Sequence, residues 1–299
     1  MKSTRVLLAL ITVMAAAAIT SAQTIDIVVL DRSVNYVQTV AGSSTLENAT
    51  PYRADVFING TNLNLLSSFS FMKPGDGVTV YSGQQNGSEW EAPTSGNAFS
   101  TMALLNTAFG AGAYTISVSG YADSSLTMTD LVGTTNDGLP NLPFVIATQN
   151  SNPVTWSGGK MLVDPTQALT ITTTTFSTNY TNGQGRIGVG VFGDIPDQEA
   201  TNETTPNSFT FSGSSVQLVI DANTFTPGQN YSGDMEFNNI IGSLVDLSTP
   251  YGGSAKGIVL YSAFTSFQIQ AIPEPSTYAA IFGGLALAGV MIRRRRRAG

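Results

Sequence analysis

The chain has 299 residues, a formal net charge of −7 and 11% charged residues, and it contains neither histidine nor cysteine. These absences exclude histidine-based catalysis, serine–histidine–aspartate triads, cysteine nucleophiles, zinc sites and disulfides. Segment 23–272 holds six basic against 19 acidic residues. Such a surface repels the phosphate backbone, so no nucleic-acid partner is expected.

The N-terminus has the parts of a secretory signal peptide in the expected order. Lys2 and Arg5 supply positive charge, an apolar stretch follows over 6–19, and small residues occupy 20–22. We therefore predict an N-terminal signal helix over residues 1–22, cleaved after Ala22. Signal peptidase and the Sec translocon are the implied partners.

Between residues 24 and 272, apolar and polar residues alternate with the period of two that is typical of half-buried strands. The clearest runs are 114–118, 187–191, 208–211, 216–220, 234–237 and 267–271. Short spacings between turn residues favour an all-β protein with antiparallel sheets over units in which strands and helices alternate. One helical turn is expected over 99–106, where apolar residues recur every three positions.

Two segments, 109–114 and 225–231, each consist of an apolar residue, a glycine turn and a tyrosine that enters a strand. This pattern resembles the tyrosine corner of immunoglobulin-like and fibronectin-type sandwiches, in which the tyrosine hydroxyl bonds to upstream backbone. With the polar stretch 149–153 as a linker, we predict one or two antiparallel β-sandwich modules, at 24–148 and 153–272. Two unrelated hairpins are the alternative.

Few side chains in this region are arranged for catalysis or metal binding. The acidic stretch 194–203 offers oxygen ligands for calcium, but its spacing does not match an EF-hand. A solvated loop is therefore expected, a calcium site is the alternative, and no metal site is assigned. Glu89 and Glu91 flank Trp90, which places both acids on one face of a strand rather than opposed across a cleft. We expect no catalytic residues, no enzymatic activity and no cofactor.

Aromatic residues supply the one candidate ligand contact. A flat platform for sugar rings could be formed by Trp90, Tyr81, Tyr121, Tyr251 and Tyr261. Trp90 is the candidate glycan contact, and packing in a core is the alternative. The threonine-rich stretch 170–175 is interpreted as an exposed strand face rather than an ice-binding array.

The C-terminal segment 273–299 combines three features. Pro273, Glu274 and Pro275 come first, and an apolar run over 279–292 follows. A basic cluster then consists of Arg293, Arg294, Arg295, Arg296 and Arg297. The apolar run predicts a single transmembrane helix, with the arginines in the cytoplasm and the preceding chain outside.

In this order, the three features resemble the PEP-CTERM sorting signal of Gram-negative bacteria that make exopolysaccharide. The resemblance covers the tail alone and implies recognition by an exosortase, a membrane protease that cuts near the motif. A plain membrane anchor without processing is the alternative. Such tails also carry a label taken from the C-terminal domain of an ice-binding protein, which describes the tail and gives no reason to expect ice binding.

Together these features predict an exported, non-enzymatic protein of the cell surface or extracellular matrix of a Gram-negative bacterium. It would pass through a precursor anchored in the inner membrane. A carbohydrate-binding adhesin of the exopolysaccharide matrix is the first alternative, and a hydrolase of matrix polymer is the second.

Overall fold

The computed structural model describes residues 24–63, 66–75, 80–86, 89–92, 96–119, 124–130, 138–178, 184–205, 209–246 and 256–272. Apart from one short helix, the regular structure in these residues is all strand, which confirms the all-β class. The predicted signal peptide with its cleavage site, and the tail with its apolar run and arginines, lie outside the described residues. Within the described part, no helix is long and apolar enough to cross a membrane.

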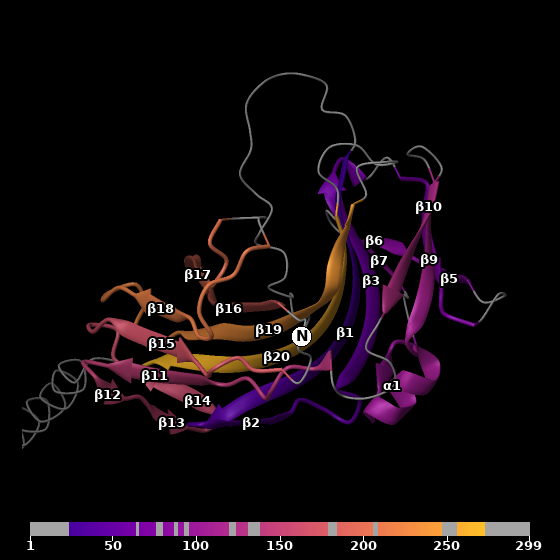
Figure 1. The fold of residues 1–299 in the computed structure, drawn as a ribbon. Coiled ribbons are helices and arrows are strands. Elements are labelled where there is room, and N and C mark those ends of the chain that lie inside the picture. Colours follow the sequence, from indigo (N-terminus) through magenta and orange to yellow (C-terminus); the bar gives the residue numbers. More distant parts are fainter. Residues whose placement is uncertain are drawn as a thin grey trace, which may run out of the picture.

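A 12-stranded sheet carries the fold (Figure 1). Its main order is β17 (Ile195–Thr201), β16 (Gln184–Gly193), β19 (Asn230–Asp246), β20 (Lys256–Ala271), β1 (Thr24–Val40), β3 (Tyr52–Thr61), β7 (Glu89–Ala92) and β6 (Gln84–Asn86). The other strands are β14 (Lys160–Val163) beside β20, β13 (Thr155–Ser157) beside β14, β2 (Ser43–Leu46) beside β1 and β8 (Ala98–Phe99) beside β3. Strands β1, β19 and β20 have 16 or 17 residues each, which makes them the long members of the sheet.

Two four-stranded sheets pack on one face of the large sheet. The first has the order β10 (Ser124–Asp130), β9 (Gly112–Ser119), β4 (Ser68–Met72) and β5 (Val80–Ser82). The second has the order β12 (Asn152–Pro153), β11 (Val145–Gln149), β15 (Leu169–Thr173) and β18 (Gln217–Ile220). Figure 1 shows them at opposite ends of the molecule, with helix α1 (Met102–Ala108) near the first.

Each small sheet encloses a separate hydrophobic core against the large one, and the long strands serve both cores. On β1, Leu30 lies in the first core and Val34 in the second. On β20, the change comes between Tyr261 and Ala263. Alternate residues of a strand point to one face, so both cores lie on the same face of the large sheet. We call the opposite face the outer face.

This arrangement corrects the predicted division into modules at 24–148 and 153–272. The first core contains Ile241 and Val259 from the second segment, and the second core contains Val34 and Val145 from the first. The cause is the central position of β1 and β20, which pair in parallel although they stand at opposite ends of the described chain. The ladders of β20 with β1 and β14 are parallel, whereas the other described ladders are antiparallel, as predicted. Strands that no hairpin joins can pair in parallel.

The polar stretch 149–153 is a hairpin turn rather than a linker. Asn150 and Ser151 have φ values of 48° and 64°. Positive φ at both central residues is characteristic of the two-residue turns that suit the twist of a hairpin. The turn joins β11 to β12 within one sheet.

Both predicted tyrosine-to-backbone hydrogen bonds are present. The hydroxyl of Tyr114 donates to the carbonyl oxygen of Gly110 at 2.6 Å. The backbone N–H of Thr226 donates to the hydroxyl oxygen of Tyr231 at 2.8 Å. Both tyrosines are buried, so these bonds fix the chain where it enters β9 and β19.

Other local predictions had mixed outcomes. The expected helical turn is α1, and the hydroxyl of Thr101 caps it by accepting from the backbone N–H of Leu104 at 3.2 Å. The predicted strand over 208–211 is wrong, because Phe209 has a φ of 52° and only Phe211 forms a bridge, to Glu203. A left-handed residue interrupts the alternation on which a strand depends.

We predict that fragments 24–148 and 153–272, expressed separately, do not fold. The first would lack β19 and β20, and the second would lack β1, so each would leave long apolar strands unpaired. Circular dichroism should show no cooperative thermal transition for either fragment. A cooperative melt of either fragment alone would show that the shared strands are dispensable.

Candidate functional site

The aromatic residues proposed as a sugar platform do not gather on one surface. Tyr261 is fully buried, and the ring of Tyr81 stacks on Phe71 with centroids 5.0 Å apart. Trp90 packs against the first core, and its indole N–H donates to the carbonyl oxygen of Leu63 at 2.9 Å. Tyr121 and Tyr251 lie outside the described residues. The structure thus gives Trp90 a packing role, and glycan contact by Trp90 stays a prediction.

The strand that carries Trp90 has the expected arrangement of faces. Trp90 pairs with Ile58, whose side chain lies in the first core, whereas Glu89 pairs with Asn59. The amide of Asn59 donates to Glu89 at 3.3 Å. The two acids therefore lie on the outer face, away from the indole.

The acidic stretch 194–203 and the threonine-rich stretch 170–175 each contribute to a strand. Most of the acidic stretch is β17, the edge strand of the large sheet, instead of the expected solvated loop. In the described ranges, no group of three or more acidic, histidine or cysteine side chains could hold a metal ion. Thr173 is buried on β15, while Thr170 and Thr172 are half-buried on its other face.

A buried band of polar side chains lies on the outer face where the long strands pass from one core to the other. We call it the polar belt: Asp31, Ser33, Arg53, Asp55, Arg186, Glu236, Asn238 and Ser262. Arg186, Asn238, Ser262, Ser33 and Arg53 stand opposite one another across β16, β19, β20, β1 and β3. Asp31, Asp55, Glu236 and Asn238 are at most 1% exposed. Burial of so many polar groups is costly unless they are paired, so their contacts decide what the belt does.

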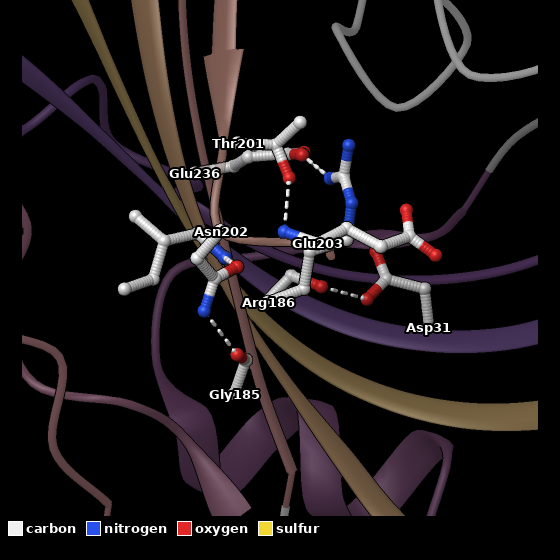
Figure 2. A network of polar contacts seen from close by, with 9 residues as sticks. Asp31, Gly185, Arg186, Thr201, Asn202, Glu203 and Glu236 are labelled. Carbon is white, nitrogen blue, oxygen red and sulfur yellow. Dashed lines mark hydrogen bonds and ion pairs between the residues drawn. The ribbon is translucent and has the colours of Figure 1, made fainter. Parts of the chain in front are cut away.

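An ion pair between Arg186 and Glu236 lies at the β16 end of the belt. Figure 2 shows the guanidinium of Arg186 pointing to the carboxylate of Glu236. Gly188 leaves room for this carboxylate, since a Cβ at position 188 would lie 2.8 Å from its Oε1. Burial lowers the pKa of Arg186, and the charges of Glu203 and Glu199 act in the opposite direction.

Asn202 attaches the chain that follows β17 to strand β16. Its side-chain oxygen accepts from the backbone N–H of Ile187 at 2.8 Å, and its amide donates to the carbonyl oxygen of Gly185 at 2.9 Å (Figure 2). These bonds continue the pairing of β16 beyond the end of β17 and hold Glu203 near Arg186.

The centre of the belt depends on β1 and β20. The hydroxyl of Ser262 donates to the carboxylate of Asp31 at 2.6 Å. On the opposite face, Arg32 is fully buried between the two cores. Its guanidinium donates to the hydroxyl of Tyr261 at 2.6 Å and lies 5.1 Å from the centre of that ring. Consecutive residues of β1 therefore bind β20 through charged groups on both faces of the sheet.

Asp55 lies at the β3 end of the belt and accepts a hydrogen bond from the side-chain amide of Asn97. The belt therefore runs from an ion pair at β16 to a buried carboxylate at β3. Ion pairs and hydrogen bonds hold the charged groups of the belt, whereas Asn238 is buried without a hydrogen-bond partner. The belt therefore positions the strands that it crosses.

Sequence reasoning missed this belt. The alternation of Asp234 and Glu236 with Met235 and Phe237 indicates acids that face solvent, yet Glu236 is 1% exposed. One signal was available: Gly188 and Gly190 alternate with valines on the strand opposite these acids. Glycines on one face of a strand leave space that side chains of neighbouring strands can fill.

Comparison with known proteins gives no match to this chain, either among protein-family models or among curated proteins.

We predict that Arg186→Leu lowers the free energy of unfolding by about 3–5 kcal/mol, because it leaves the buried carboxylate of Glu236 unpaired. The double variant Arg186→Leu/Glu236→Leu should recover most of this loss, since it removes both charges. Urea denaturation measures both. Lys160→Leu, which changes a partly exposed cation, is the matched control with an expected effect below about 0.5 kcal/mol. Equal losses in the single and double variants would contradict the ion pair.

Trp90→Ala should cost about 2–3 kcal/mol of unfolding free energy, because it removes a large ring from the edge of the first core. Trp90→Phe keeps most of the ring and loses only the bond to Leu63, so a cost of about 1 kcal/mol is expected. Thermal denaturation distinguishes the two. A negligible effect of Trp90→Ala would favour an exposed ligand contact.

Proposed function

We propose that this chain is an exported, tail-sorted protein of the cell surface or extracellular matrix, with a non-enzymatic β scaffold between two targeting segments. The exosortase signal predicted from Pro273, Glu274 and Pro275 would direct its sorting. The scaffold would consist of two immunoglobulin- or fibronectin-like β-sandwiches that share long strands. The hydrogen bonds of Tyr114 and Tyr231 support this last point.

One observation carries the proposal: the described strands all lie between the two predicted targeting segments. β1 begins at Thr24, directly after the expected cleavage at Ala22. β20 ends at Ala271, directly before the Pro273 motif. Removal of the tail from Pro273 therefore leaves every described strand intact, as processing near this motif requires.

The central pairing of β1 with β20 also suits export in an unfolded state. The large sheet lacks its middle until β20 has been synthesised, and β20 stands directly before the tail. A chain with this topology stays incompletely folded during translocation, which the Sec route requires. The absence of cysteine means that folding outside the cytoplasm depends on packing and hydrogen bonds, not on oxidation.

Matrix carbohydrate is a less supported ligand. Of the five aromatic residues proposed as a platform, Tyr261 is fully buried and Trp90 and Tyr81 pack against a core. A carbohydrate-binding adhesin therefore stays the alternative, and measured binding of a matrix glycan would support it.

Deletion of 273–299 should release the protein to the periplasm or medium with an unchanged melting temperature, because all described strands end before Pro273. Cell fractionation and thermal denaturation of the released protein measure both effects. A triple variant, Pro273→Ala/Glu274→Ala/Pro275→Ala, separates sorting from anchoring, since it should stay in the membrane at its unprocessed mass. Unchanged surface retention of the deletion variant would overturn the sorting proposal.

A further inference from the structure

Two carboxyl groups lie on either side of β16 near the edge of the large sheet. Glu199 of β17 and Asp234 of β19 both stand opposite Gly190 of β16, one on each side and on the same face. The ring of Phe192 covers Gly190, since a Cβ at position 190 would lie 2.4 Å from Phe192 Cζ. The ring of Phe192 therefore lies over the strand position between the two acids. Asp234 is half-buried there, whereas Glu199 is exposed at the sheet edge.

The charges around this pair do not balance. The acidic groups of the described residues that face it are Asp197, Glu199 and Glu203 on β17 and its continuation, and Asp234 and Glu236 on β19. Arg186 on β16 is the cation that faces them, and it is already paired with Glu236. From β20, Phe264 and Ser266 stand opposite Glu236 and Asp234 and carry no charge.

A second feature shows that this face has unused capacity for hydrogen bonding. Asn238 lies two residues beyond Glu236 on the same face and is 1% exposed. Neither its amide nitrogen nor its oxygen has a hydrogen-bond partner, and Asp234 Oδ1 is likewise buried without one. Buried polar atoms are rarely left in this state.

Proton binding relieves part of this imbalance. Burial, with the charge of Glu199 as the second cause, raises the pKa of Asp234 to about 8. Burial also raises the pKa of Glu199, and the charge of Asp197 adds to the effect.

We propose that β17 is a pH-dependent edge of the sheet, held on β16 while the Asp234 and Glu199 pair retains a proton and loosened when that proton leaves. This inference is independent of the proposed function, because it depends only on the described residues. Only the ladder with β16 would have to open, because β17 is an edge strand of the large sheet. Ile195 and Ala200 of β17 would then lose their packing against the second core.

The direction of the pH effect follows from linkage. With β17 open, Asp234 contacts water and its pKa returns toward the ordinary value of about 4. The closed state therefore binds more protons than the open state between about pH 4 and 8. Opening becomes easier as pH rises through this window and changes no further above it.

Opening would also uncover an apolar patch. The chain after β17 carries Glu203, whose carboxylate accepts from the backbone N–H of Phe209 at 2.9 Å. Phe209 and Phe211 pack on the outer-face cluster of Val29, Phe57, Ile240, Ile258 and Leu260. Release of β17 would thus weaken the cover of five apolar side chains.

Hydrogen exchange of the full chain, purified in detergent and followed by mass spectrometry, tests this inference. After correction for intrinsic exchange rates, the opening constant of amides in 195–203 should rise more than tenfold between pH 5.5 and pH 8.5. Amides of β9 and β11 should change less than twofold. Asp234→Asn should abolish the pH dependence in 195–203, and Glu199→Gln should reduce it. Asp221→Asn, an exposed acid outside the cluster, is the matched control and should behave as the wild type.

A pH-independent opening constant in the wild-type chain would overturn the inference. So would an unchanged slope in Asp234→Asn, or an equal rise in β9 and β11, which would indicate global unfolding. If Asp234→Asn does not melt cooperatively, Glu199→Gln decides by itself, and an unchanged slope in that variant counts against the proposal.

Discussion

The fold depends on the parallel pairing of its first and last strands. β1 and β20 lie side by side from Ile27 and Lys256 to Gln38 and Phe267, and every other strand of the large sheet is added to one side of this pair or the other. Both hydrophobic cores take residues from both strands, so neither core is complete without them. Because the two strands come from opposite ends of the described chain, they are paired by the tertiary structure and not by a local turn. The entropy cost of this long-range contact must be met before most of the packing energy is gained.

The same pair explains why charged residues are buried in a chain with few of them. Two cores on one continuous sheet must be separated by residues that neither core absorbs, and Arg32 fills that place on the inner face. Asp31 and Ser262 do so on the outer face. Side chains of this kind specify register: a shift of β1 by one residue would place Arg32 on the outer face and Asp31 between the cores. The ion pair of Arg186 and Glu236 likewise fixes the register of β16 against β19. The polar belt thus contributes more to the uniqueness of the fold than to its stability.

Much of the local structure could be read from the sequence, because it depends on near neighbours. Alternation located β9, β16, β18 and parts of β19 and β20, and the glycine turns before Tyr114 and Tyr231 predicted the hydrogen bonds of these two hydroxyls. The partners of β1 and β20 could not be predicted, since no turn chemistry connects them. Asn150 and Ser151 were interpreted as a linker because polar residues mark turns and linkers alike. The belt was missed for a related reason: Asp234 and Glu236 alternate with apolar residues as surface acids do, and the glycines on β16 were the one sign that this face holds buried side chains.

The positions of the strand ends also determine how the molecule would respond to mechanical force. β1 begins at one end of the parallel pair and β20 finishes at the other, so tension between the two chain ends pulls the strands in opposite directions along their length. Their hydrogen bonds are then loaded in shear and must break together, whereas strands pulled apart from one end separate bond by bond. A protein tethered at its C-terminal end and held elsewhere by a surrounding matrix would meet such tension. The pairing that delays folding until the last strand is made would then also resist extension once folding is complete.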